Sequence, residues 1–207
     1  VNIIVGFLKN FRKFKVVTIS DALREYYLKN YKLPSDRILT VRSAVDFEKY
    51  QSTMKSSDLI ADLLPMPNQK IMLHSGSIGP GRGAELFSRI LEEFPDVVIL
   101  QVGGSDRDLL KLKAKIGNQR FVTVPRVESE DSLIALQLCA DFSLFPMSNN
   151  VETAWCCSPM KIFEYAALGK PLVSTTVGAV SELINKQNAF TFNSERPETL
   201  IAAIRDV

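Results

Sequence analysis

The sequence of 207 residues contains little cysteine, a single histidine and almost no excess of charge. Its cysteines, Cys139, Cys156 and Cys157, form an odd set in which two are adjacent, a poor arrangement for an ordinary structural disulfide. This indicates a reducing, cytoplasmic compartment. Since no Cys/His cluster has ligand spacing, no metal site of that kind is expected. A net charge of +2 is too small to predict a nucleic-acid-binding surface, so nucleic acid is not an expected partner.

The sequence also lacks any run of about 18 apolar residues, so no segment is expected to span a membrane. Its composition, 46% hydrophobic and 23% charged, is typical of an ordinary globular protein. The chain begins with Val1 rather than Met and ends inside a helical pattern at 199–207. A fragment of a longer protein is therefore expected.

Residues 1–15 interleave Phe and Leu with Lys and Arg at the spacing of a basic amphipathic helix. Such a helix could make a peripheral contact with an anionic membrane surface. The alternative that we favour is packing of its apolar face on a domain that is partly absent from this chain. The patterns at 16–19, 20–33 and 38–41 predict strand, helix and strand, with Ser20 as the helix N-cap, at the edge of a larger α/β sheet.

Residues 51–69 are rich in Ser, Lys, Asp and Pro, which predicts a hinge linker, and a short helix over 59–64 is compatible with the pattern. After the linker, short apolar segments alternate with helical patterns. The predicted strands lie at 71–75, 97–102, 121–124, 142–145, 171–175 and 189–192, and the predicted helices at 83–94, 106–116, 131–138, 159–168, 180–184 and 197–205. This alternation predicts a parallel, doubly wound, Rossmann-like α/β sheet, whose ligands bind at the carboxyl ends of the strands.

The stretch SPMKIFEYAALGKPLVS, residues 158–174, predicts a helix with an anion site at its N-terminus. Ser158 is a strong N-cap residue, and Pro159 suits the first helical position because its missing N–H is of no consequence there. Lys161 and Glu164 lie three residues apart on one helical face, so a cation and an acceptor carboxylate point the same way. This combination suits a phosphate joined to a diol.

A glycine-rich stretch, HSGSIGPGRG at 74–83, lies between a predicted strand and a predicted helix. Backbone amides at Gly76 and Gly81, together with the guanidinium of Arg82, could hold a diphosphate. The spacing approaches that of a P-loop, but Arg82 and Gly83 replace the lysine and the hydroxyl residue, which disfavours an NTPase. A flexible turn with a solvated arginine is the alternative.

Two further strand ends carry polar residues. Asp106 and Asp108 could bind a divalent ion between phosphates, but we favour an N-cap at Ser105 with acidic residues in the first helical turn. The Val-Pro-Arg loop at 124–126 could line a base pocket through backbone groups, or its arginine could be a solvated loop charge.

The polar loop at 146–157 holds two of the thiols. A cysteine nucleophile would need a base, and the only histidine, His74, belongs to another strand end. We therefore predict buried, unreactive thiols. His74 itself is predicted to be a packed or hydrogen-bonded strand residue.

In their order along the chain, these stretches resemble the retaining GT-B glycosyltransferases of the group-one class, family four. VTISDALREYYLKNYKLPSDRILTVRSAVDFEKY resembles the end of that family's N-terminal domain, with Arg42-Ser43-Ala44 where Pro-Asn-Gly is usual. GSIGPGRG resembles its phosphate loop, with Ser77 in place of a first arginine. SPMKIFEYAALGKPLVSTTVGAVSELI resembles the most specific pattern of the family.

The resemblance implies roles for individual residues. Glu164 would bind the ribose hydroxyls of a nucleotide sugar, and Arg82 would clamp its diphosphate. Ser158 and Lys161 would lie near the phosphates or the sugar. The implied catalytic residues are Arg82, Lys161 and Glu164, and the implied substrate-binding residues are Gly76, Ser77, Gly81, Gly83, Val124, Pro125, Arg126, Ser158, Pro159 and Met160.

The resemblance also implies domains and a reaction. Residues 1–50 would end an acceptor-side domain, 51–69 would be a linker, and 70–207 would bind the nucleotide sugar. The implied activity is metal-independent, retaining transfer of a hexose from a UDP- or GDP-type donor to a glycan or lipid-linked acceptor, as in polysaccharide biosynthesis, with no cofactor besides the donor. Cys156 stands where many members carry a glutamate that contacts the donor sugar, although Glu152 could substitute for it. A nucleotide-sugar epimerase and a non-catalytic nucleotide-sugar-binding module are the alternatives.

Overall fold

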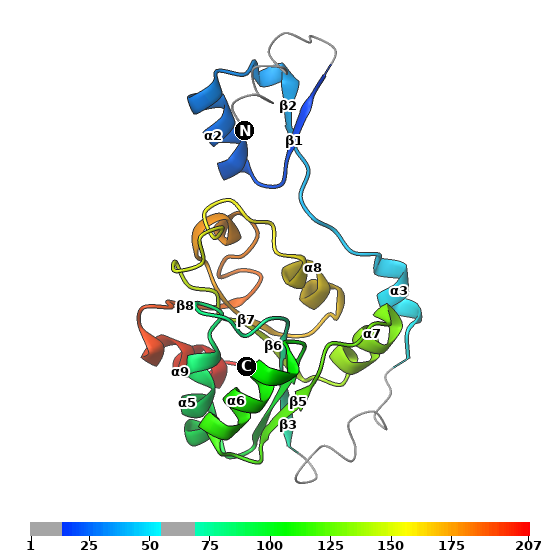
Figure 1. Ribbon diagram of the computed structural model, residues 1–207, viewed down its shortest axis with the longest axis vertical. Coiled ribbons are helices and arrows are strands. Elements are labelled where there is room, and N and C mark those ends of the chain that lie inside the picture. The colour runs from blue at the N-terminus through cyan, green and yellow to red at the C-terminus, as the bar shows by residue number, and fades with distance from the viewer. Residues whose placement is uncertain (1–13, 55–68) are drawn as a thin grey trace.

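The computed structural model describes residues 14–54 and 69–207, and it contains a small N-terminal unit and a larger α/β unit (Figure 1). The elements of the small unit are β1 (Val16–Thr18), α2 (Asp21–Tyr31), the 3₁₀ helix η1 (Ser35–Arg37) and β2 (Ile38–Thr40). The two strands pair in parallel, so the predicted strand-helix-strand order is confirmed. The Ser20 hydroxyl accepts a hydrogen bond from the Leu23 N–H at 3.1 Å, which confirms the predicted N-cap.

The larger unit is built on a six-stranded sheet in which every neighbouring pair is parallel. Its strands are β3 (Lys70–Ser75), β4 (Val97–Val102), β5 (Phe121–Val124), β6 (Phe142–Phe145), β7 (Leu172–Thr175) and β8 (Phe190–Phe192). They lie in the order β5-β4-β3-β6-β7-β8, so the strand order reverses between β3 and β6. The predicted doubly wound α/β sheet is confirmed, and its switch point lies at the carboxyl ends of β3 and β6.

The segments between the strands are mostly the helices that the periodicity predicts. They are α3 (Phe47–Ser52), η2 (Ala84–Leu86), α5 (Phe87–Glu93), α6 (Asp106–Ile116), α7 (Glu130–Leu138), α8 (Met160–Ala167), η3 (Gly178–Glu182) and α9 (Pro197–Arg205). Helix α3 is not among the predicted helices, and its N-cap Asp46 accepts from the Lys49 N–H at 3.4 Å. At α6, the Ser105 hydroxyl accepts from the Asp108 N–H at 3.2 Å, which confirms the capping interpretation of that stretch.

Both faces of the larger sheet are buried, and alternate residues of each strand point to opposite faces. Leu73 and Leu100 belong to a cluster that also contains residues of α7 and α8, whereas Met72 and Ile99 cluster with residues of α5 and α9. All four side chains are fully buried. Because helices cover both faces, the loops at the strand ends are the part of the unit that is open to a ligand.

One buried hydroxyl in this core has no hydrogen-bond partner among the described residues. Ser143 on β6 is 1% exposed, and its Oγ makes no hydrogen bond. Ser143→Ala removes this desolvated hydroxyl and is expected to raise the free energy of unfolding by about 1 kcal/mol, as measured by urea denaturation. Ser174→Ala is the matched control and should lower it, because Ser174 Oγ donates to the Thr175 carbonyl at 2.8 Å. A loss of stability in Ser143→Ala would contradict the expectation.

Two predictions fall outside the described residues. They are the basic amphipathic helix, of which residues 1–13 are not described, and the short helix at 59–64. The peripheral membrane contact therefore stays a prediction, as does the division into an acceptor-side domain, a linker and a nucleotide-sugar-binding domain. Across the described ranges, no helix is long and apolar enough to cross a membrane.

Candidate functional site

Helix α8 begins at the carboxyl ends of the strands with its first turn uncapped. Met160 is its first residue, Pro159 precedes it in an extended conformation, and no side chain of the described residues caps the turn. The predictions of Ser158 as the N-cap and Pro159 as the first helical residue are therefore wrong. Ser158 Oγ accepts instead from the Ser43 N–H at 3.0 Å, and Ser43 Oγ donates to the Ser158 carbonyl at 2.9 Å. The free amides of α8 still favour an anion at this end.

The Lys161 side chain lies over the turn at Gly76, directly after β3. A Cβ atom added to Gly76 would lie 2.1 Å from Lys161 Cε and 2.6 Å from its Nζ, so glycine leaves room for the ammonium group. Gly76 also has a φ of +121°, which L side chains rarely adopt. Burial lowers the pKa of Lys161, Glu164 opposes this change, and the charge of Arg82 adds to it. The two predicted cations therefore act on each other at this turn, while the neighbouring Ser77 is exposed.

The loop that carries Arg82 packs against the loop that follows β6. A Cβ atom on Gly83 would lie 2.2 Å from Pro146 Cγ, and the Gly81 carbonyl accepts from the Ser148 N–H at 2.9 Å. Arg82, half-buried, lies between these two close contacts. The structure thus brings Gly81, Arg82 and Gly83 together with Lys161 at the switch point of the sheet.

A buried glutamine holds the backbone beneath this loop. Gln101 Nε2 donates to the carbonyls of Gly76 at 2.8 Å and of Gly103 at 2.9 Å. Its Oε1 therefore accepts the Nδ1–H of His74 at 2.6 Å, which assigns the proton of the neutral imidazole to Nδ1. Burial lowers the pKa of His74 to about 4, so this side chain is neutral at physiological pH. The predicted hydrogen-bonded role of His74 is confirmed, whereas sequence reasoning missed Gln101.

Glu164 lies on α8 one turn beyond the lysine and is held from α7. Its Oε2 accepts from Gln137 Nε2 at 2.8 Å, and Gln137 Oε1 accepts from the Tyr50 hydroxyl at 3.3 Å. The next residue, Tyr165, ties α8 to the end of β3 because its hydroxyl accepts from the Ser75 N–H at 2.8 Å. Sequence reasoning assigned no role to Gln137 or Tyr165, because the groups that they contact come from other segments of the chain.

A pocket of about 870 Å³ opens at the carboxyl ends of β4 and β5. Its lining residues are Gly104, Ser105, Asp106, Pro125, Arg126 and Glu128. Pro125 and Arg126 thus line a pocket at the predicted place. Val124 is the last residue of β5, and its carbonyl accepts from the Gly103 N–H at 2.9 Å, so it does not line the pocket. Two of the three loop residues that could line a base pocket therefore line this pocket, and binding of a base in it stays a prediction.

The thiols near this site are not poised as nucleophiles. Burial raises the pKa of Cys156 and Cys157, so both are protonated at neutral pH. The predicted full burial of these two thiols is wrong, because Cys156 and Cys157 are only half-buried. Glu152 is exposed on the same loop. Within the described ranges, no group of three His, Cys, Asp or Glu side chains is placed to hold a metal ion.

The strand order and the position of these loops are those of a Rossmann-like sheet that binds a ligand at its switch point. A family model described as glycosyl transferases group 1 matches residues 73–207. The chain therefore belongs to the group 1 glycosyltransferase family, and the predicted resemblance is confirmed. Its larger sheet corresponds to one half of a GT-B glycosyltransferase.

Relatives of this chain are longer than the chain itself. Chitobiosyldiphosphodolichol beta-mannosyltransferase from Candida albicans is 24% identical over 202 residues, which cover 88% of this chain and 42% of that protein. HepE from Anabaena in complex with UDP matches with a TM-score of 0.76 and 19% identity, over 98% of this chain and 56% of that one. A glycosyltransferase from Rickettsia africae ESF-5 matches with a TM-score of 0.72 and 21% identity, over 93% of this chain and 52% of that one. At these identities the solved structures show the fold, and the chain spans about half the length of these relatives.

Proposed function

We propose that this chain forms the nucleotide-sugar-binding part, and the end of the acceptor-side part, of a retaining glycosyltransferase. The observation that carries the proposal is the convergence of Lys161, Arg82 and the uncapped amides of α8 at the glycine turn after β3. Two cations beside a helix N-terminus make a site for a diphosphate. Glu164, further along the same helix, offers a carboxylate to the ribose diol, and a protein of the same fold, HepE, binds UDP.

In the proposed reaction, the diphosphate leaves the sugar and is held by fixed positive charges of the site. As the bond between the sugar C1 and the diphosphate oxygen breaks, negative charge develops on the diphosphate, where Arg82, Lys161 and the amides of α8 stabilise it. The sugar becomes oxocarbenium-like, and the acceptor hydroxyl oxygen bonds to C1 from the face that the diphosphate leaves. The hydroxyl proton passes to the departing diphosphate. Because two side-chain cations neutralise the charge, the proposal includes no metal ion.

The donor is of the UDP or GDP type, with its base in the pocket that Pro125 and Arg126 line. The acceptor is a glycan or lipid-linked hydroxyl, held by the acceptor-side part of the protein. A thermal-shift comparison of UDP-, GDP- and ADP-sugars identifies the base, because a ligand at 100 times its Kd stabilises a protein by about 2.7 kcal/mol.

A non-catalytic nucleotide-sugar-binding module is the second candidate. The observation that favours it is the protonated thiol of Cys156 at a position where the resemblance implies a carboxylate. Such a module would bind the donor and transfer nothing when the intact gene product is assayed with donor and acceptor. An epimerase would instead change the donor sugar without any acceptor.

Glu164→Ala is expected to weaken binding of the preferred nucleotide at least about tenfold, because hydrogen bonds to a charged carboxylate contribute about 1.5 to 3 kcal/mol. Calorimetry measures this loss. The 2′,3′-dideoxy form of the same nucleotide should bind the variant and the wild type equally, since the hydroxyls that Glu164 holds are gone. Glu92→Ala removes the same charge from an exposed position on α5 and is the control.

Two outcomes would contradict this assignment. An equal loss of affinity for the ribose and dideoxyribose nucleotides would show that Glu164 does not bind the diol. Unchanged affinity in both Glu164→Ala and Arg82→Ala would show that the nucleotide lies elsewhere.

A further inference from the structure

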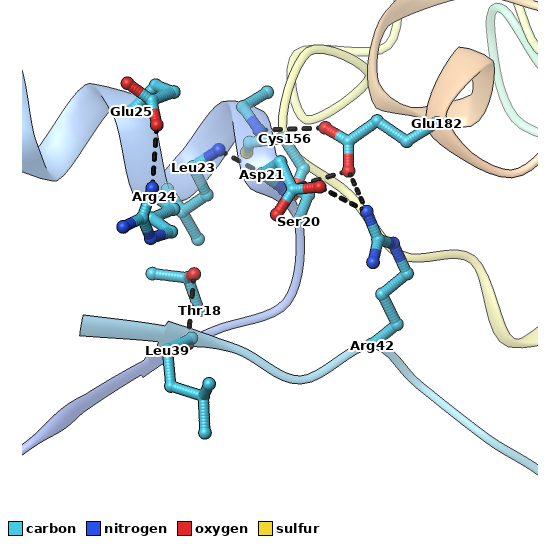
Figure 2. Close-up of polar contacts among 11 residues, drawn as sticks. Thr18, Ser20, Asp21, Leu23, Arg24, Glu25, Leu39, Arg42, Cys156 and Glu182 are labelled. Atoms are coloured by element: carbon cyan, nitrogen blue, oxygen red, sulfur yellow. Dashed lines mark hydrogen bonds and ion pairs between the residues drawn. The ribbon is translucent and has the colours of Figure 1, made fainter. Parts of the chain in front are cut away.

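The small unit meets the larger one through a set of polar contacts that we call the α2 interface (Figure 2). It joins residues 20–22 and 42–43 on one side to Cys156, Ser158 and Glu182 on the other. Ser20 Oγ donates to the Cys156 carbonyl at 2.8 Å, so the cap of α2 also contacts the other unit. The rings of Tyr26 and Trp155 add an apolar contact, with centroids 5.2 Å apart.

Glu182, at the end of η3, caps α2 with both of its carboxylate oxygens (Figure 2). Its Oε2 accepts from the Asp21 N–H and its Oε1 from the Ala22 N–H, each at 2.8 Å. These amides belong to the first turn of α2, where no intrahelical carbonyl can pair with them. The helix dipole also favours a negative charge at this end. The Glu182 side chain is only 17% exposed, so little water is available to take over these bonds.

Arg42 extends the α2 interface towards α8. Its Nη2 lies 3.0 Å from Glu182 Oε2 and 2.5 Å from Asp21 Oδ2. The next residue, Ser43, exchanges two hydrogen bonds with Ser158, which lies just before α8. A fixed Arg42 therefore restrains Ser43, and Ser43 restrains the chain that leads into the helix.

We propose that Glu182 is a positioning residue of the transferase, which holds the acceptor-side segment in one orientation at the donor site by capping α2 from the donor-binding unit. The acceptor and donor roles of the two units rest on the function proposed above, whereas the contacts between the units do not. Of the contacts across the α2 interface, the hydrogen bonds from the Asp21 and Ala22 N–H groups are the two that require an acceptor group at Glu182. They are therefore the contacts through which Glu182 contributes to the orientation, beside those made by Ser20 and Ser43.

Hydrogen exchange in this chain tests the proposal directly. In Glu182→Ala, amides of α2 are expected to exchange about tenfold faster, since the N-cap acceptor is gone, while amides of β3 and β4 keep their rates. Glu182→Gln should restore part of the protection, because its amide oxygen still accepts one bond. It also provides a folded variant if Glu182→Ala fails to fold. Glu93→Ala, which breaks the ion pair of Glu93 with Arg205 at 3.1 Å, should leave α2 unchanged.

A charge swap separates the cap from the ion pair. The double variant Arg42→Glu with Glu182→Arg keeps opposite charges across the interface but places donors, not acceptors, before the amides of Asp21 and Ala22. The α2 amides of this double variant are expected to exchange as fast as those of Glu182→Ala. Three outcomes would each overturn the proposal. They are restored protection of the α2 amides in the charge swap, unchanged exchange of those amides in Glu182→Ala, and faster amide exchange throughout the larger unit.

Calorimetry with UDP and GDP distinguishes positioning from direct donor contact. Glu182→Ala is expected to bind the preferred nucleotide within about twofold of the wild type, because Glu182 faces α2 and not the Lys161 turn. A fivefold or greater loss would make Glu182 a donor contact and overturn its positioning role. If the wild type binds neither nucleotide, the proposed function fails, while the exchange experiment still decides whether Glu182 holds α2.

Discussion

A variant that lacks both cations of the site, Arg82→Ala with Lys161→Ala, is expected to bind UDP or GDP about a thousandfold more weakly than the wild type. Each charge-assisted contact to a phosphate contributes about 1.5 to 3 kcal/mol, so two of them account for about 4 kcal/mol. The loss should exceed the sum of the two single losses. Arg82 lowers the pKa of Lys161, so Arg82→Ala favours the charged form of Lys161, which reduces the loss of affinity in that single variant.

The matched control removes the same charge from elsewhere on the larger unit. Arg89→Ala with Lys113→Ala deletes two exposed cations on α5 and α6 and should change affinity less than about twofold at fixed ionic strength. Calorimetry measures both pairs, and urea denaturation checks that the variants remain folded. Binding of the double site variant within fivefold of the wild type would show that the diphosphate is not held at this turn.

The strands of the larger sheet were predictable because each is a short apolar run buried on both faces. The bounds of β4, β5 and β6 agree with the prediction, while β7 begins at Leu172 and not at Pro171. Proline has no N–H for the ladder, although its carbonyl still accepts from the Ser143 N–H at 2.9 Å. Helix α3 was missed because its six residues make fewer than about two helical turns, too few to repeat an apolar pattern. It buries Tyr50 against α7 through a contact that only the fold creates.

The candidate site was predictable where the chemistry lies in local residue types. An anion site is predicted by glycines beside an arginine and by a lysine in the first turn of a helix. The structure places these two cations, Arg82 and Lys161, close enough to act on each other. The wrong prediction of Ser158 as an N-cap came from a local residue preference. Its hydroxyl accepts a hydrogen bond instead from the N–H of Ser43, 115 residues earlier in the chain. Gln101 and Gln137 were not predictable, because the partners that give them their roles come from other strands and helices.

Gly178→Ala is expected to lower the free energy of unfolding by about 3 kcal/mol beyond the effect of Gly117→Ala, the upper end of the usual cost of overpacking. Gly178 and Gly117 have φ values of +54° and +61°, so the left-handed strain of about 1 to 2 kcal/mol is common to both substitutions. The surroundings differ. A Cβ on Gly178 would lie 2.2 Å from the Ala154 carbonyl oxygen and 2.9 Å from Trp155 Cα, whereas nothing lies within 4 Å of one on Gly117. Overpacking against backbone cannot be relieved by a rotamer change.

The carbonyl that blocks this Cβ is held in place, because the Ala179 N–H donates to the Ala154 oxygen at 2.9 Å. The clash at Gly178 must therefore either break that bond or move η3 away from the loop, and η3 carries Glu182 at its end. Urea denaturation of the two glycine variants measures the difference in stability, and hydrogen exchange of α2 should accelerate in Gly178→Ala alone. Equal stability of the two variants would mean that η3 does not lie against this loop. The place of Glu182 at the start of α2 would then be wrong as well.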